Sequence, residues 1–150
     1  MPAVVDSSTL ISLAWSGYLR LLHGVPVEMV VPDVVRTEVV TQGAAAGYAD
    51  AVAIDTAIAA LAIVATRPGG GVDAAVLAAA GQAGTLVTND QALGRRAANL
   101  GSRWLRTADL VILCVKTDAI SAVDGRAALD ALHATGRLSP ALHTRYLEEL

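Results

Sequence analysis

Short apolar segments alternate with helical patterns through roughly the first hundred residues, and this alternation restricts the fold more than any other feature of the chain. The first segment, residues 3–5, ends at Asp6 and is typical of a buried strand. Strands separated by helices predict an α/β fold, with a mostly parallel sheet flanked by helices on both faces. The further strands are expected at 27–31, 61–66, 85–88 and 103–106.

Helices are expected wherever capping residues and glycines enclose the remaining segments. Their expected ranges are 7–16, 18–23, 34–41, 48–60, 73–80, 89–100, 107–116, 121–135 and 139–149. No repeat or linker divides the chain, so we expect one domain over residues 1–150. The last third carries no strand pattern, and residues 117–150 are therefore expected to form a helical C-terminal extension.

The composition supports a packed core but not a basic binding surface. Hydrophobic residues make up 54% of the chain and charged residues 17%, and the net charge is −3. General nucleic-acid binders are usually basic, so a polyanionic partner would need a divalent cation to neutralise the local acid. The small share of charged residues also indicates a surface that is buried on assembly, and we expect a homodimer.

The sequence favours a cytoplasmic protein with no membrane association. The N-terminal residues lack the basic region and long apolar stretch of a signal peptide. The longest apolar stretch, residues 51–65, contains Asp55 and is too short to span a bilayer. The single cysteine, Cys114, excludes a disulfide framework and is expected in the core.

Acidic residues stand in apolar surroundings at four places near expected strand ends or helix starts: Asp6, Glu38, Asp73 and Asp90. In parallel sheets, sites form where the carboxyl ends of the strands meet, and both Asp6 and Asp90 follow a strand. A charge beside a buried element is costly unless it is paired, yet few cations lie near these acids in the sequence. Carboxylates without matching cations are the ligands that Mg²⁺ or Mn²⁺ prefers.

Bound near a phosphodiester, such an ion can lower the pKa of an attacking water and stabilise the charge that develops on the leaving oxygen. We therefore expect the four acids to be both metal ligands and catalytic residues. Three polar neighbours are candidates for orienting the ligands or a bound water, although helix capping explains them almost as well: Ser8, Thr88 and Asn89.

Each acid also has a simpler explanation when it is considered alone. Asp73 and Asp90 stand at helix starts, where aspartate is favoured as a cap. Glu38 could be an ordinary solvated helix residue. Asp6 is the hardest to explain in this way, because it ends an apolar strand and precedes three hydroxyl residues. Trp15 lies in an apolar sequence and is expected in the core rather than on a base-stacking surface.

Four segments, in order, resemble the motifs of the PIN domain family, specifically its VapC-like ribonuclease toxins. The segments carry the four acids in turn and lie at residues 4–11, 31–40, 71–78 and 86–93. The last, with Thr88-Asn89-Asp90, is the most specific. Relatives often begin the third motif with more than one acid, whereas here Val72 precedes the single Asp73. The tail at 135–142 resembles a branch of the family with extra C-terminal helices.

This resemblance implies a three-layer sandwich of parallel sheet and helices, a Mg²⁺ or Mn²⁺ cofactor, and endonucleolytic cleavage of RNA. For the toxin branch, it also implies a homodimer and a small antitoxin protein, a segment of which occupies the active-site groove.

Two other functions stay open at this stage. One is a catalytically idle PIN-like module that only binds a partner, which the retention of four acids disfavours. The other is a Mg²⁺-dependent phospho-receiver domain, which needs paired acids after the first strand and a lysine near the end of the domain. Here Asp6 stands alone after that strand and the only lysine is Lys116, so the receiver is the weaker alternative.

Overall fold

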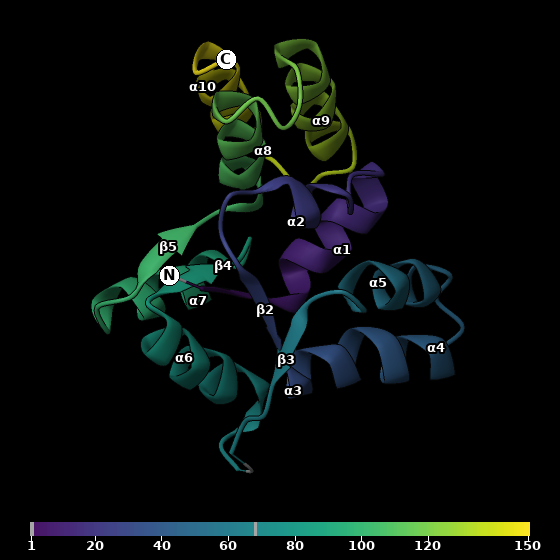
Figure 1. The fold of residues 1–150 in the computed structure, drawn as a ribbon, viewed down its shortest axis with the longest axis vertical. Coiled ribbons are helices and arrows are strands. Elements are labelled where there is room, and N and C mark those ends of the chain that lie inside the picture. The colour runs from purple at the N-terminus through teal and green to yellow at the C-terminus, as the bar shows by residue number, and fades with distance from the viewer. Residues whose placement is uncertain (1, 68) are drawn as a thin grey trace.

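The computed structural model describes residues 2–67 and 69–150 and contains a five-stranded parallel sheet. The strands are β1 (Ala3–Val5), β2 (Met29–Pro32), β3 (Ala62–Val64), β4 (Thr85–Val87) and β5 (Arg103–Leu105). Their spatial order is β3-β2-β1-β4-β5, and every neighbouring pair is parallel (Figure 1). The predicted fold class, a parallel sheet flanked by helices, is confirmed.

Helices connect the strands and pack on the sheet and on one another (Figure 1). They are α1 (Ser7–Ser16), α2 (Leu21–Gly24), α3 (Asp33–Arg36), the π-helix η1 (Thr37–Gln42), α4 (Gly43–Ala45), α5 (Asp50–Ile58), α6 (Gly71–Ala83), α7 (Gln91–Asn99), α8 (Thr107–Lys116), α9 (Ala122–Ala134) and α10 (Pro140–Glu148). Helix α6 packs against α7, β1 and β4, whereas α1 packs against α5, η1 and α9.

The expected C-terminal helices are present as α9 and α10, and they stack beside α8 (Figure 1). The stack is fixed by a polar contact as well as by apolar packing. Tyr146 on α10 is buried and donates its hydroxyl to Asp109 on α8 at 3.0 Å. Burial, together with the neighbouring Asp109 charge, raises the pKa of Tyr146 to about 12.

One predicted helix is irregular in the structure. The segment 34–41 was expected to form a single helix, but it divides into α3 and the π-helix η1, which contains Glu38. A π-helix bonds each amide to the carbonyl five residues back, and such turns are frequent at functional sites. The sequence could not reveal it, because the apolar positions of this segment fit an α-helix equally well.

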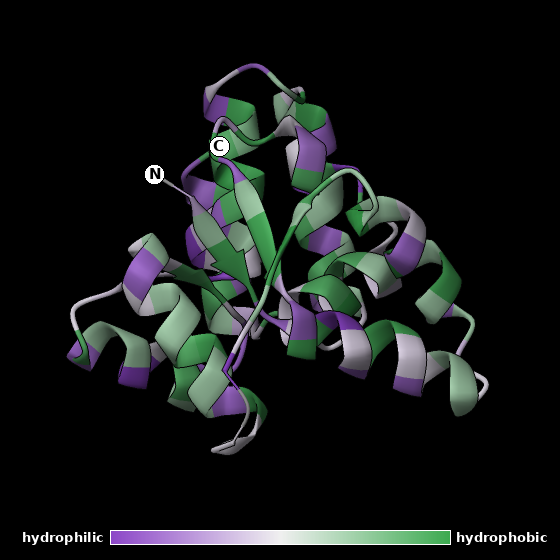
Figure 2. Cartoon of the chain, turned by 60° about the horizontal axis from the view of Figure 1, so that its bottom comes forward, coloured by the Kyte–Doolittle hydropathy of each residue, from purple (hydrophilic) through white to green (hydrophobic). Residues whose placement is uncertain are grey.

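The core lies around the central strands, where apolar residues are buried on both faces. Residues of β1, β2 and β4, including Val5, Val31 and Leu86, are fully buried. Figure 2 shows these strands in green, in contrast to the mixed colouring of the surrounding helices. The edge strand β3 is different, because its Ile63 side chain is exposed. Within the described residues, no helix is long and apolar enough to cross a membrane.

Trp15 contradicts its predicted place in the core, because 52% of its surface is exposed. The reason is the face of α1 on which it lies. Leu10 and Leu13 on this helix are fully buried, and Trp15 projects from a different face. A run of apolar residues in sequence therefore misled the prediction, since the helical turn decides which of them reach the core.

The Trp104 side chain of β5 packs directly against helix α7 at Gly94. A Cβ atom added to this buried glycine would stand 2.1 Å from the Cε2 atom of Trp104 on β5. The indole of Trp104 in turn donates its Nε1 hydrogen to the carbonyl of Thr88 at 3.1 Å. Gly94 thus allows the indole to pack beneath α7 and to hold the segment that follows β4.

Candidate functional site

Asp6 lies at the point where the strand order of the sheet reverses. It follows β1, and its backbone N–H donates to the carbonyl of Val87, the last residue of the neighbouring strand β4, at 3.0 Å. The chain leaves β1 and β4 toward opposite sides of the sheet, so the carboxyl ends of these strands form a topological switch point, the place where ligands of open parallel sheets bind. Asp6 is only 5% exposed at this switch point.

The Asp6 carboxylate is surrounded by hydroxyl groups. Ser8 and Thr88 donate to its Oδ2 atom at 3.0 and 2.8 Å, and Ser7 donates more weakly to Oδ1 at 3.5 Å. No Lys, Arg or His within residues 2–67 and 69–150 forms an ion pair with it. The site therefore holds a buried negative charge that hydroxyl dipoles, rather than a cation, stabilise.

Thr88 connects Asp6 to Asp90, the acid that follows β4. The Thr88 hydroxyl donates to Asp6 and also accepts the backbone N–H of Asp90 at 3.0 Å. Asp90 caps α7, since its Oδ1 accepts the N–H of Leu93 at 3.0 Å. The capping role considered from the sequence is thus present. Asp90 is exposed, and its Oδ2 accepts no hydrogen bond from the described part of the chain.

Asn89 joins three parts of the fold behind these acids. Its side-chain nitrogen donates to Ser12 on α1 at 2.8 Å and to the carbonyl of Arg137 at 3.3 Å. Its side-chain oxygen accepts the N–H of Thr107, at the start of α8, at 3.2 Å. The backbone N–H of Asn89 donates to the Ser8 hydroxyl at 2.9 Å. The three polar neighbours noted in the sequence therefore form one hydrogen-bonded network with Asp6.

Arg137, between α9 and α10, is a member of this network that the sequence did not single out. Its guanidinium donates to the Ser12 hydroxyl at 2.9 Å and to the Ser8 carbonyl at 3.2 Å. The same guanidinium lies over the Trp15 ring, 5.1 Å from its centroid. Arg137 is about 130 residues from Ser8 in sequence, and only the resemblance of the tail to family members could have drawn attention to its segment.

Among the described residues, Glu38 and Asp73 form no side-chain hydrogen bond with this network. Glu38 is partly buried on η1 and faces a cavity of about 510 Å³ beside α1 and α5. Asp73 is exposed in the first turn of α6. Among the described residues, no three Asp, Glu, His or Cys side chains are arranged to hold one metal ion. The structure thus connects Asp6 and Asp90 through Thr88, whereas a shared site of four acids stays a prediction.

A further carboxylate, Asp33, lies at the end of β2 on the same edge of the sheet. Its Oδ1 accepts the hydroxyl and the N–H of Thr66, which follows β3, and the N–H of Val34. The Thr66 hydroxyl lowers the pKa of Asp33, and burial opposes this effect only in part. Asp33 is not one of the four acids that the sequence pattern singles out.

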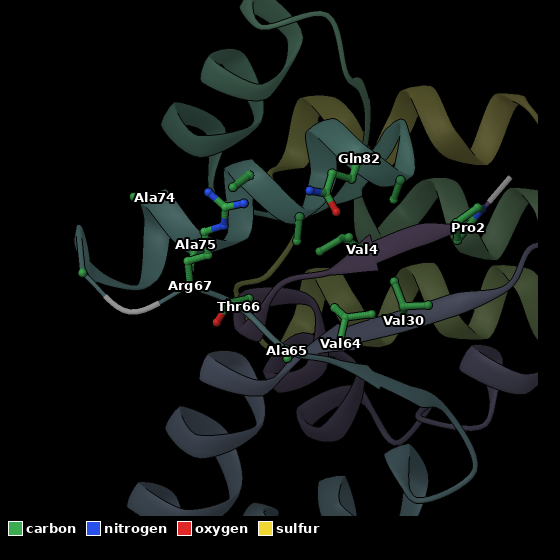
Figure 3. Close-up of a pocket in the computed structure, with 14 residues that line it drawn as sticks. Pro2, Val4, Val30, Val64, Ala65, Thr66, Arg67, Ala74, Ala75 and Gln82 are labelled. Carbon is green, nitrogen blue, oxygen red and sulfur yellow. The ribbon is translucent and has the colours of Figure 1, made fainter.

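A larger cavity, of about 590 Å³, lies between α6 and strands β1 to β3 (Figure 3). Its walls are mainly valine and alanine side chains, such as Val4, Val64 and Ala75. Arg67, Thr66 and Gln82 are its polar members, and no carboxylate is among the described residues that line it. None of the predicted site residues is therefore among the described residues that line this cavity, although it is larger than the cavity that Glu38 faces.

A family model described as a PIN domain matches residues 2–150. The chain belongs to the PIN domain family. No curated protein matches it. Among solved structures, it is similar to a PilT N-terminus domain protein from the hyperthermophilic archaeon Sulfolobus solfataricus, with 14% identity and a TM-score of 0.52. That match covers 77% of this chain and 95% of the other. At this identity, the likeness shows the fold alone.

A divalent ion, which PIN domains typically use, fits the donor chemistry at Asp6. The carboxylate is buried, it has no cationic partner within the described ranges, and oxygen donors surround it. Asp90 adds a carboxylate oxygen that accepts no hydrogen bond from the described residues. Mg²⁺ is commonly held by only one or two carboxylates together with waters and substrate phosphates, so the absence of a three-acid cluster among these residues is compatible with it.

Proposed function

We propose that this PIN domain is a divalent-metal-dependent endoribonuclease and that it acts as the VapC-like toxin of a toxin–antitoxin pair. The observation that carries the proposal is the buried Asp6 carboxylate, which lies at the switch point of the sheet and forms no ion pair within the described chain. Ligands of open parallel sheets bind in the crevice at that point. Asp6 and Asp90 would hold Mg²⁺ or Mn²⁺ there, with Glu38 and Asp73 as further acids of the same site.

The bound ion would activate a water molecule and stabilise charge on the leaving oxygen of the RNA phosphodiester. The chain's own residues prepare this site. Ser8 and Thr88 fix the orientation of the Asp6 carboxylate through their hydroxyls. Asn89 and Arg137 hold Ser8 and Ser12 in place from behind. Asp90 caps helix α7 with its Oδ1 atom. Its Oδ2 atom would be available to bind the ion or to accept a proton from the attacking water.

A second candidate is a PIN module that binds a partner without catalysis. The observation that favours it is that no three acids of the described residues are arranged as a ligand cluster for one metal ion. The assembly of the protein as a homodimer with a small antitoxin belongs to the toxin proposal and rests on the same family likeness. We place the protein in the cytoplasm as part of that proposal.

Metal-dependent cleavage separates the two candidates. Purified protein is expected to cut a labelled single-stranded RNA in the presence of Mg²⁺ or Mn²⁺, to stop in EDTA, and to resume when either ion is added in excess. Cleavage products are resolved on a denaturing gel. If RNA stays intact with both ions while the protein is folded by circular dichroism, the idle module is correct. If cleavage continues in EDTA, it does not depend on a bound ion.

A further inference from the structure

The cavity between α1, η1 and α5 contains an unusual pair of exposed aromatic side chains. Trp15 is 52% exposed and Tyr48 is 68% exposed, and both line this cavity of about 510 Å³. Large aromatic rings on the surface of a protein lose the free energy that burial would provide, so their joint presence in a cavity indicates a binding surface. The volume lies within the range of small-ligand sites.

The Trp15 ring is held in a fixed orientation although half of it is exposed. Its Nε1 hydrogen is donated to Asp50 Oδ2 at 2.7 Å. The Arg137 guanidinium lies over the ring, 5.1 Å from its centroid. A ring that is oriented in advance loses little conformational entropy when a flat ligand stacks on it. Trp15 therefore has the properties of a stacking platform.

This cavity adjoins the Asp6 network on one side. Arg137 forms the connection, because the guanidinium that lies over Trp15 also donates to the Ser8 carbonyl and to Ser12. Ser8 in turn donates to Asp6. Glu38, one of the four predicted acids, lines the cavity itself. A ligand seated here would thus lie beside the place where a phosphodiester would be cleaved.

The cavity combines apolar walls with hydrogen-bond acceptors. Ile11, Val39 and Ile54 supply apolar surface, and the carboxylates of Glu38 and Asp50 are polar members of the lining. An apolar peptide side chain would exclude water from Glu38 and from the second oxygen of Asp50 without supplying a donor to either, which is costly. The edge of a nucleobase with an exocyclic amino group would supply donors to them, as cytosine N4 does to carboxylates in other complexes.

We propose that this cavity binds an unpaired nucleobase of the RNA substrate, stacked on Trp15, and prefers bases with an exocyclic amino group. The proposal deepens the ribonuclease function above and rests on it. Stacking supplies affinity without reading sequence. Asp50 supplies the preference, because its Oδ1 accepts no hydrogen bond from the described residues and is available to an amino donor. Uracil presents a carbonyl oxygen where cytosine presents an amino group, so the same carboxylate repels it.

The test is a binding measurement that needs no cleavage. Fluorescence anisotropy with labelled single-stranded oligocytidylate and oligouridylate is measured in Ca²⁺, which neutralises carboxylates but is not expected to support hydrolysis. Wild-type protein should bind oligocytidylate more tightly. Trp15→Ala should weaken binding of oligocytidylate by roughly tenfold to a hundredfold, the scale of one lost base stack. Trp15→Phe, which keeps a smaller ring, should lose only a few-fold.

Two further readouts separate stacking from a general loss of structure or charge. Trp15→Ala should leave the salt dependence of binding unchanged, since stacking releases no counterions. Asp50→Asn should keep the bond to Trp15 through its amide oxygen but reduce the preference for cytidine. Val123→Ala, a change at a residue that is 78% exposed on α9, is the matched control and should bind as wild type.

The inference is wrong if Trp15→Ala binds both RNAs as tightly as the wild-type protein does. This outcome overturns it even if a protein partner is later found to bind in the cavity. It is also wrong if wild type binds neither RNA, or if oligouridylate binds as tightly as oligocytidylate. Cleavage in Mg²⁺ is measured in parallel. If RNA is cut but Trp15→Ala has no effect on binding, only the base site fails, and if Trp15→Ala weakens binding while no RNA is cut, only the nuclease proposal fails.

Discussion

Asp6→Asn is expected to lower RNA cleavage by about a hundredfold to a thousandfold, with little change in the stability of the fold. The substitution keeps the shape of the side chain but removes the negative charge that would hold the ion. Losses of this size are typical when a group that stabilises transition-state charge is removed. Initial rates of cleavage at saturating Mg²⁺ measure the effect per folded molecule.

The fold should tolerate this change because of the hydrogen bonds around Asp6. The amide oxygen of asparagine can accept the hydroxyls of Ser8 and Thr88, as Oδ2 does now. No ion pair within the described residues is lost. The free energy of unfolding should therefore change by no more than about 1 kcal/mol. Asp124→Asn on the exposed surface of α9 is the control; it should leave activity unchanged and lower the free energy of unfolding by less than about 1 kcal/mol, because Asp124 lies in the first turn of the helix. A structural role would give the reverse pattern, with stability lost and activity retained.

Gly94→Ala is expected to destabilise the fold by about 3 kcal/mol, near the upper end of the usual cost of overpacking. The added Cβ would lie 2.1 Å from the Trp104 ring, and the indole cannot withdraw freely because its Nε1 is bonded to the Thr88 carbonyl. Either α7 or the indole must move, and movement of the indole would also disturb the segment that carries Asp90. Urea denaturation measures the change.

Gly81→Ala is the matched control for this prediction. Gly81 is also a helical glycine, on α6, but it is exposed and a Cβ there would contact nothing within 4 Å. Its replacement should stabilise the protein by about 0.5–1 kcal/mol, because alanine restricts the unfolded chain. Equal effects of the two substitutions would show that the close approach of Gly94 to Trp104 is not maintained in solution.

The sheet could be predicted from the sequence because its signal is local. Each strand is a short apolar segment bounded by capping residues or glycines, and helices separate the strands. The alternation alone then requires parallel pairing. The edge strand β3 has partly exposed side chains and the weakest strand pattern in the sequence, yet it lies within the expected range 61–66.

The candidate site could be predicted only in part, because its remaining features depend on tertiary contacts. The nearby placement of Asp6 and Asp90 could be expected because both follow apolar strands, and the topology places those strands side by side. The bonds of Asn89 and Arg137 join residues dozens of positions apart, and no local pattern marks them. The exposure of Trp15 depends on which face of α1 meets the core.

The π-helix η1, which contains Glu38, could not be predicted from the sequence pattern either. Glu38 lies near the start of this π-helix and lines the cavity beside Trp15. That all four acids share one site stays a prediction.

The central claim, that Asp6 holds a divalent ion at the switch point, is tested most directly by Mn²⁺ binding. Electron paramagnetic resonance measures free Mn²⁺ during a titration with wild-type protein, Asp6→Asn and the Asp124→Asn control. We expect wild type and the control to bind the ion alike, and Asp6→Asn to bind it about a hundredfold more weakly. Removal of a group that only orients a metal ligand already weakens metal binding by about tenfold to a hundredfold, so the loss of a ligand itself should cost at least as much. Equal binding by wild type and Asp6→Asn, or no binding by wild type, would contradict the account.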